Sequence, residues 1–138
     1  MKRVTAIGGI FFKCDDPQAQ RDWYANHLGL KTDDYGTTFE WRKSDKPEEK
    51  GYSVWSTFKK DTDYFEPSKK EFMINFRVED LDALLIELKK EGVQVVGEVQ
   101  NLEYGKFAHI MDPEGNKIEL WQSIDEEYGK MVGDVVTK

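Results

Sequence analysis

The feature of this sequence that most constrains its fold is an internal repeat. Residues 10–19 (IFFKCDDPQA) align without gaps on residues 74–83 (INFRVEDLDA). Each copy is an apolar run typical of a β-strand, followed by two acids and then by a helical pattern. The repeat therefore predicts two copies of one supersecondary unit. Because one unit alone would leave a sheet face unburied, the copies should pair, either within one chain or between two chains.

Both copies predict a helix directly after the strand. Asp16 and Asp80 stand at the N-cap position, where a carboxylate accepts hydrogen bonds from the first free backbone N–H groups of a helix. Apolar residues at helical spacing follow over about 17–27 and 81–91, and each stretch leads to a glycine that can end a helix. We therefore expect two amphipathic helices that pack on a sheet.

Three β-type segments, separated by turn residues, follow each helix. They cover about residues 30–36, 37–43 and 52–58 in the first half and 93–99, 106–112 and 117–123 in the second. The prediction is one α+β domain over residues 1–138, built from tandem βαβββ half-modules at about 3–58 and 70–123. The charged residues 59–69 should be a linker. Residues 124–138 should be a polar tail with a possible short helix.

Composition restricts the compartment and the partners. The single cysteine, Cys14, permits no intrachain disulfide, and no stretch approaches the roughly 20 apolar residues of a membrane span. We therefore expect a cytoplasmic protein without a membrane partner. The formal net charge of −7 argues against binding to nucleic acid, which is contacted by clustered Lys and Arg. Aromatic residues make up 13% of the chain and include four Trp. They could belong to the core or to a dimer interface, or they could form a wall that stacks against a planar ligand.

The motifs of both halves resemble those of the vicinal-oxygen-chelate superfamily, which includes glyoxalases, bleomycin resistance proteins and extradiol dioxygenases. The first half contributes the acid-capped helix with Trp23-Tyr24 and Leu28-Gly29, and the second contributes DPEGNKIEL at 112–120. The resemblance spans about residues 3–123. It implies a cupped, barrel-like mixed sheet around a shared pocket, and a homodimer. A fold by itself settles no function.

Metal-dependent members of this family hold a divalent ion with four side chains, and this sequence keeps one of them. The resemblance places the four positions at Gly9, Ser53, Met73 and Glu119. Glycine has no ligating side chain, and a thioether suits the hard or borderline ions of this chemistry poorly. We therefore expect no bound metal and no other cofactor, although a divalent ion held by substitute residues stays an alternative.

The expected pocket surrounds these positions. Strand alternation places Phe11 and Lys13 on the face of position 9, and Asn75 and Arg77 on the face of position 73. Lys13 and Arg77 could instead form surface ion pairs. The other candidates for ligand binding are Glu40, Trp41, Trp55, Tyr104, His109, Glu119 and Trp121.

Glu119 and His109 are the candidate catalytic residues. A pocket carboxylate can face a cationic ligand or act as a base, but a strand carboxylate can also be merely solvated or salt-bridged. The direction of the His109 ring depends on a strand register that the sequence does not fix. If Glu119 faces the ligand, it should govern ligand binding more than stability.

Two functions are compatible with these patterns. The favoured one is a metal-independent protein that binds a small cationic or aromatic molecule in an aromatic-lined cup, as resistance proteins of this superfamily do. The alternative is a metal-dependent glyoxalase-like lyase, isomerase or dioxygenase, with Glu40, His109 and Glu119 as substitute ligands. The absence of three of the four family ligands favours the binding protein.

Overall fold

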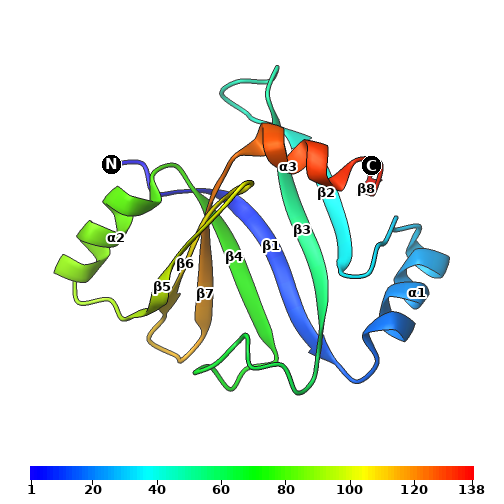
Figure 1. Cartoon of the computed structure of the whole chain (residues 1–138), viewed down its shortest axis with the longest axis horizontal. Helices are drawn as coiled ribbons and strands as arrows, with labels where there is room; N and C mark the ends of the chain where they lie inside the picture. Colours follow the sequence, from blue (N-terminus) through cyan, green and yellow to red (C-terminus); the bar gives the residue numbers. More distant parts are fainter.

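The computed structural model describes all 138 residues, as one mixed sheet with three helices (Figure 1). The strands are β1 (Val4–Cys14), β2 (Gly36–Arg42), β3 (Lys50–Lys59), β4 (Phe72–Val78), β5 (Val95–Leu102), β6 (Gly105–Met111), β7 (Lys117–Ser123) and β8 (Val136–Thr137). The helices are α1 (Pro17–Leu28), α2 (Leu81–Lys90) and α3 (Asp125–Val132). None of these helices has the length and apolar character needed to cross a membrane.

The predicted α+β class and the cupped mixed sheet are confirmed. The strand order is β5-β6-β7-β4-β1-β3-β2-β8, so β5 and β8 form two open edges and the sheet curls without closing into a barrel. Figure 1 shows α2 and α1 at opposite ends of the curved sheet, with α3 lying across β3 and β2.

The two copies of the sequence repeat pair with each other at the centre of the sheet. β1 and β4 run antiparallel, and Ile10 is the register partner of Ile74, the residue that matches it in the repeat. Outward from this junction, β1 pairs in parallel with β3 and β4 pairs in parallel with β7. The two halves therefore join within a single chain.

The helix starts follow the predicted capping chemistry. The Asp16 carboxylate accepts from the backbone N–H of Ala19 at 3.0 Å, and the Asp80 carboxylate accepts from that of Ala83 at 3.1 Å. α1 ends at Gly29, whose φ of 72° is a left-handed conformation that glycine adopts at little cost. Both helices begin where the sequence places them because a local hydrogen bond decides the position.

The segment 30–36, expected to be a strand, is a loop up to the start of β2. The Asp33 carboxylate accepts hydrogen bonds from the backbone N–H groups of Tyr35, at 2.8 Å, and Gly36, at 3.0 Å. Such side-chain bonds fold the backbone into a turn and compete with strand pairing. The place beside β2 is taken by β8 of the tail, which pairs with β2 in parallel.

A strip of apolar side chains on β1 and β4 stays exposed on the convex face of the sheet. Ile7, Ile10 and Phe72 are 51%, 48% and 42% exposed. α1 packs mainly on β3, and α2 packs on β6 and β7, so neither helix covers the strip.

The homodimer implied by the family resemblance remains a prediction, and this strip is a surface that a second copy could bury. Light scattering at micromolar concentration should give a particle with twice the chain mass of 16.1 kDa. A particle of one chain mass at that concentration would contradict the dimer.

Candidate functional site

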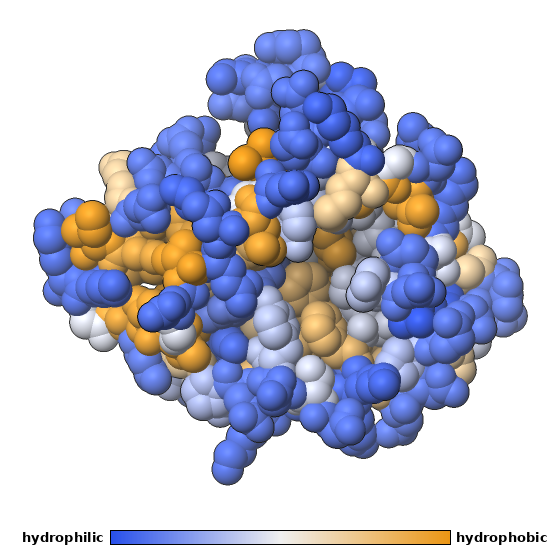
Figure 2. Space-filling view, viewed as in Figure 1, coloured by the Kyte–Doolittle hydropathy of each residue, from blue (hydrophilic) through white to orange (hydrophobic).

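The concave face of the sheet holds a cavity of about 280 Å³, which Figure 2 shows as a hollow in the centre of that face. Strands of both halves line it, together with the segment between β3 and β4 and with α3. Its 15 lining residues, ten of them hydrophobic, are Gly8, Phe11, Val54, Ser56, Phe58, Tyr64, Asn75, Gln100, Leu102, Tyr104, Phe107, Glu119, Trp121, Tyr128 and Met131.

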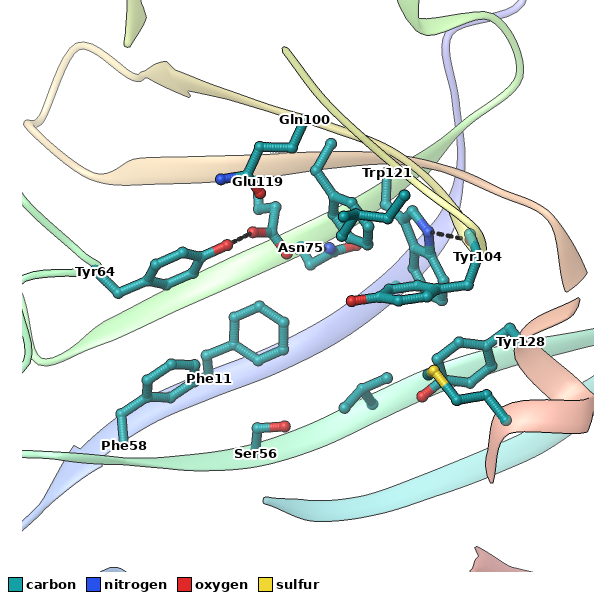
Figure 3. Close-up of a pocket in the computed structure, with 15 residues that line it drawn as sticks. Phe11, Ser56, Phe58, Tyr64, Asn75, Gln100, Tyr104, Glu119, Trp121 and Tyr128 are labelled. Atoms are coloured by element: carbon teal, nitrogen blue, oxygen red, sulfur yellow. Dashed lines mark hydrogen bonds between the residues drawn. The ribbon is translucent and has the colours of Figure 1, made fainter. Parts of the chain in front are cut away.

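Aromatic rings form two opposite ends of the cavity (Figure 3). At one end the rings of Phe58 and Tyr64 stack with their centroids 5.7 Å apart, and Phe11 packs against Phe58 at 5.6 Å. Glu119 and Asn75 lie between the two ends. The other end is formed by Tyr104, Phe107, Trp121 and Tyr128.

The side chain of Glu119 is held by three neighbours and is only 2% exposed. Asn75 Nδ2 donates to Glu119 Oε1 at 2.7 Å, the Tyr64 hydroxyl donates to Oε2, and His109 Nε2 lies 2.8 Å from Oε2. Strand register explains two of these contacts, because Asn75 on β4 and His109 on β6 are both register partners of Glu119 on β7. A buried carboxylate is expensive unless it is hydrogen-bonded, and this one is satisfied at both oxygens.

Tyr64 reaches Glu119 from the segment between β3 and β4. Lys117 Nζ donates to the Tyr64 carbonyl at 2.7 Å and lies 5.4 Å from the Tyr64 ring, so it fixes this part of the segment. Burial, and then the charge of Glu119, raise the pKa of the Tyr64 hydroxyl far above its ordinary value. The phenol therefore stays protonated and remains a donor to Glu119.

Burial also raises the pKa of Tyr104 and Tyr128, so the cavity should be sensitive to alkali. A group whose folded pKa exceeds its unfolded value of about 10 contributes stability that is present below that pH and lost as the pH rises through the folded pKa. We therefore expect the free energy of unfolding to fall above about pH 10, and to fall less in Tyr64→Phe.

Urea unfolding at a series of pH values, with the ultraviolet absorbance of tyrosinate, measures both effects. The control is Tyr35→Phe, at a side chain that is 75% exposed, and it should keep the wild-type pH profile. If all tyrosines of the folded protein ionise together near pH 10, the buried hydrogen bond of Tyr64 does not exist in solution.

α3 is attached to the sheet by an ion pair that lies outside the cavity. Arg77 on β4 binds Asp125 at the start of α3 through two hydrogen bonds of 2.8 and 2.7 Å. Burial opposes ionisation of Asp125, but hydrogen bonds from Arg77 and Ser123 outweigh it and lower its pKa. The pair positions α3, which brings Tyr128 and Met131 to the cavity.

Six of the residues predicted from the sequence come together at this site. Phe11, Asn75, Tyr104, Glu119 and Trp121 line the cavity, and His109 contacts Glu119 from the neighbouring strand.

The other predicted residues lie outside the cavity. Lys13 Nζ is 5.5 Å from the Phe65 ring, Glu40 pairs with Lys50 at 3.6 Å, and Trp41 Nε1 donates to Ser53 Oγ. Arg77 pairs with Asp125, as described above. Trp55 lies beneath α1 against Tyr24, with ring centroids 4.5 Å apart. Its neighbours Val54 and Ser56 line the cavity, so strand alternation turns Trp55 to the other face.

Sequence reasoning missed the contributions of two segments. Tyr64 lies in the stretch taken for a linker, and Tyr128 and Met131 lie in the stretch taken for a tail. The adjacent aromatic residues Tyr64 and Phe65, inside an otherwise charged stretch, were the available signal. Phe65 is fully buried.

The residues at the family's metal positions do not fit a divalent ion. Ser53 Oγ donates to the Ile7 carbonyl at 2.6 Å, and Met73 is fully buried in the core. Both oxygens of Glu119 already accept hydrogen bonds from protein groups. No group of three His, Cys, Asp or Glu side chains in the chain is close enough to hold a metal, and Glu40 lies apart from His109 and Glu119.

A chelator should therefore leave the melting temperature of the purified protein unchanged, and added zinc, nickel or manganese should not raise it. A ligand that binds only the folded state raises stability by mass action, so thermal melts with and without the ions detect binding directly. If the chelator markedly lowers the melting temperature and one of these ions restores it, the protein has a metal centre.

Three solved structures resemble this chain in fold. A variant methylmalonyl-CoA epimerase of Streptomyces coelicolor, in complex with 2-nitronate-propionyl-CoA, is 20% identical with a TM-score of 0.62, over 88% of this chain and 99% of that chain. The methylmalonyl-CoA epimerase of Mycobacterium tuberculosis is 20% identical with a TM-score of 0.54, over 91% and 93% of the two chains. The Mn(II)-bound glyoxalase of Novosphingobium aromaticivorans is 18% identical with a TM-score of 0.57, and the match covers 88% of this chain and 40% of that longer one.

The sequence itself identifies the family. A search of curated proteins gives no match to the chain. The family model described as the Glyoxalase/Bleomycin resistance protein/Dioxygenase superfamily matches residues 6–120, which is most of the chain and includes both halves of the repeat. The cupped mixed sheet and the place of Glu119 at the cavity agree with that resemblance. This chain belongs to the glyoxalase/bleomycin resistance/dioxygenase (vicinal-oxygen-chelate) superfamily.

Proposed function

We propose that the protein binds a small, flat, largely aromatic molecule in the cavity without the help of a metal ion. The observation that carries this proposal is that the carboxylate of Glu119 is hydrogen-bonded to protein side chains. Tyr64, Asn75 and His109 occupy the oxygens of Glu119, and aromatic rings surround the space in front of them.

Size and lining support a small aromatic ligand. The cavity of about 280 Å³ lies at the lower end of the range of small-molecule sites, which are mostly apolar with a few polar groups. Aromatic side chains bury a large apolar area and favour offset or edge-to-face contact with other rings. The polar groups at the wall, Ser56, Asn75, Gln100 and Tyr104, can orient such a ligand.

Charge at the wall supports a neutral or cationic ligand over an anionic one. Glu119 is the one acidic lining residue, and no Lys or Arg lines the cavity. Inside a protein, where the effective dielectric constant is low, the repulsion between an anionic ligand and this carboxylate would be large.

The geometry favours binding over acid–base catalysis. A catalytic base must reach a substrate proton within hydrogen-bond distance, and the oxygens of Glu119 are engaged by protein donors. The neighbours of known activity share less than a quarter of their residues with this chain, so their reactions are not carried over.

Isothermal titration calorimetry with two probes of one shape tests the proposal. Naphthalenemethanol is neutral and naphthalenecarboxylate is anionic, and both present the same ring system. In the presence of a chelator, the neutral probe should bind, and the anion should bind at least about tenfold more weakly, since about 1.4 kcal/mol of repulsion is enough for that ratio.

A variant that fills the cavity locates the binding site. Ser56→Leu adds apolar bulk at the wall and should abolish binding of naphthalenemethanol, whereas Ser44→Leu, at an exposed turn position, should not. If neither probe binds, or if Ser56→Leu binds as well as wild type, the cavity is not the site proposed here.

A further inference from the structure

Resting on the function proposed above, we propose that the ligand carries a fully alkylated, quaternary ammonium group, held by the aromatic rings beside Glu119. Such a group is a permanent cation without N–H donors. Charge, an unpaired acceptor, aromatic enclosure and the occupancy of Glu119 each support this chemistry.

The first observation is a negative charge that no cation of the cavity wall balances. Glu119 is 2% exposed and is the only acidic residue among those that line the cavity. Two nearby cations do not line the cavity, although Lys117 Nζ lies 5.4 Å from the Tyr64 ring and the Arg77 guanidinium lies 5.4 Å from the Trp121 ring. Arg77 pairs with Asp125, and Lys117 Nζ donates to the carbonyl of Tyr64. A cationic ligand in the cavity would therefore meet an attractive potential in a region of low dielectric constant.

The second observation is a buried acceptor without a donor. Asn75 is 1% exposed, and its Oδ1 has no hydrogen-bond partner although its Nδ2 is fixed on Glu119. Gly8 makes room for this carboxamide, because a Cβ at position 8 would collide with Asn75 Oδ1. Buried acceptors are rarely left unpaired, and this one adds to the negative potential beside the cavity.

The third observation is the enclosure by aromatic faces and edges. Figure 3 shows labelled rings of Phe11, Phe58, Tyr64, Tyr104, Trp121 and Tyr128 around the cavity, with Glu119 and Asn75 between the two ends. The electron-rich faces of aromatic rings attract cations, and several rings around one cation are the known means of holding quaternary ammonium groups.

The fourth observation distinguishes a quaternary group from a primary amine. A primary ammonium must find acceptors for its three N–H groups when it leaves water. Glu119 already accepts from Tyr64 and Asn75 and lies 2.8 Å from His109 Nε2, so few of its lone pairs remain. The unpaired Asn75 Oδ1 beside it cannot accept from all three N–H groups. A fully alkylated nitrogen needs no acceptor, and it gains from the charge and from the rings.

Three benzyl probes test the inference by calorimetry. Benzyltrimethylammonium carries the proposed group, neopentylbenzene is its neutral carbon isostere, and benzylammonium has the same charge with N–H donors. Benzyltrimethylammonium should bind at least about tenfold more tightly than either of the others. Equal affinity for neopentylbenzene, or tighter binding of benzylammonium, would overturn the inference. Binding of naphthalenemethanol that Ser56→Leu abolishes would still support the proposed function in that case.

A ring substitution separates cation recognition from simple filling of the cavity. Tyr104 lines the cavity, and its backbone carbonyl accepts hydrogen bonds from Trp121 Nε1 and from the backbone N–H of Ile124. These bonds do not involve the side chain, so replacing it should not unfold the chain. Tyr104→Leu should lower the affinity for benzyltrimethylammonium by about tenfold, while the affinity for neopentylbenzene changes by less than about twofold. Tyr104→Phe keeps the ring and should bind both as wild type does. If Tyr104→Leu loses the same affinity for both probes, the ring acts only through its apolar area.

Discussion

Replacement of Glu119 by glutamine is expected to lower the free energy of unfolding by about 3 kcal/mol, which is about 10 °C in melting temperature for a domain of this size. The carboxylate accepts charge-assisted hydrogen bonds from Tyr64 and Asn75. A glutamine amide can accept at one of its ends only, so its NH₂ group would face one of these donors. Urea unfolding monitored by circular dichroism measures the difference.

Two further variants show whether the network accounts for the loss. Glu114→Gln, at an exposed turn residue, should leave stability unchanged. Tyr64→Phe removes a single donor and should cost about 1 to 2 kcal/mol. If Glu119→Gln is as stable as wild type, the hydrogen bonds contribute nothing to stability, and the expectation from the sequence, that Glu119 matters for the ligand more than for stability, would hold instead.

Replacement of Arg77 by methionine is expected to have a similar or larger effect, about 3 to 5 kcal/mol, because it leaves the partly buried Asp125 without its main partner. The guanidinium also lies 5.0 Å from the Trp41 ring and 5.4 Å from the Trp121 ring, so these contacts are lost as well. Since the pair holds the start of α3, the variant should also bind naphthalenemethanol more weakly. Urea unfolding and calorimetry on the same preparation measure both losses.

The matched control is Arg3→Met. Arg3 also forms two hydrogen bonds with a carboxylate, that of Glu91, but at the surface. Loss of this exposed ion pair should not change the melting temperature measurably, because solvent screens exposed pairs. If Arg77→Met and Arg3→Met behave alike, the buried pair does not fix α3.

The pair between Arg77 and Asp125 also predicts an effect of acid. The pKa of Asp125 is lowered in the folded protein, so the stability that it contributes is present above about pH 4 and is lost as the pH falls through the folded pKa. The decrease in stability of Arg77→Met below pH 4 should therefore be smaller than that of wild type.

The central part of the fold was predictable because local chemistry and the repeat determine it. Asp16 and Asp80 set the helix starts through side-chain hydrogen bonds that span three residues. The repeat predicted that the two halves pair, and the antiparallel junction at Ile10 and Ile74 shows that they do so within one chain. Strand alternation then places Asn75 beside Glu119, as the register confirms.

The remaining features depend on contacts between distant segments. The 30–36 stretch has strand-like residues, but Asp33 folds it into a turn, and β8 from the far end of the chain takes the place beside β2. Tyr64 reaches Glu119 across the cavity from a segment whose charge suggested exposure. Trp55 points away from the cavity. The sequence could not show this, because strand alternation fixes the direction of a side chain only once the register of β3 is known. Patterns within one segment do not contain this information.

The central claim is that ligand binding in the cavity needs no metal, and one calorimetric titration tests it most directly. Naphthalenemethanol is titrated into protein treated with chelator, and again after zinc, nickel or manganese is restored in excess. We predict the same affinity and the same stoichiometry of one ligand per chain in every titration, because Tyr64, Asn75 and His109 already satisfy Glu119. Binding that appears only when one of the metal ions is present would contradict the account.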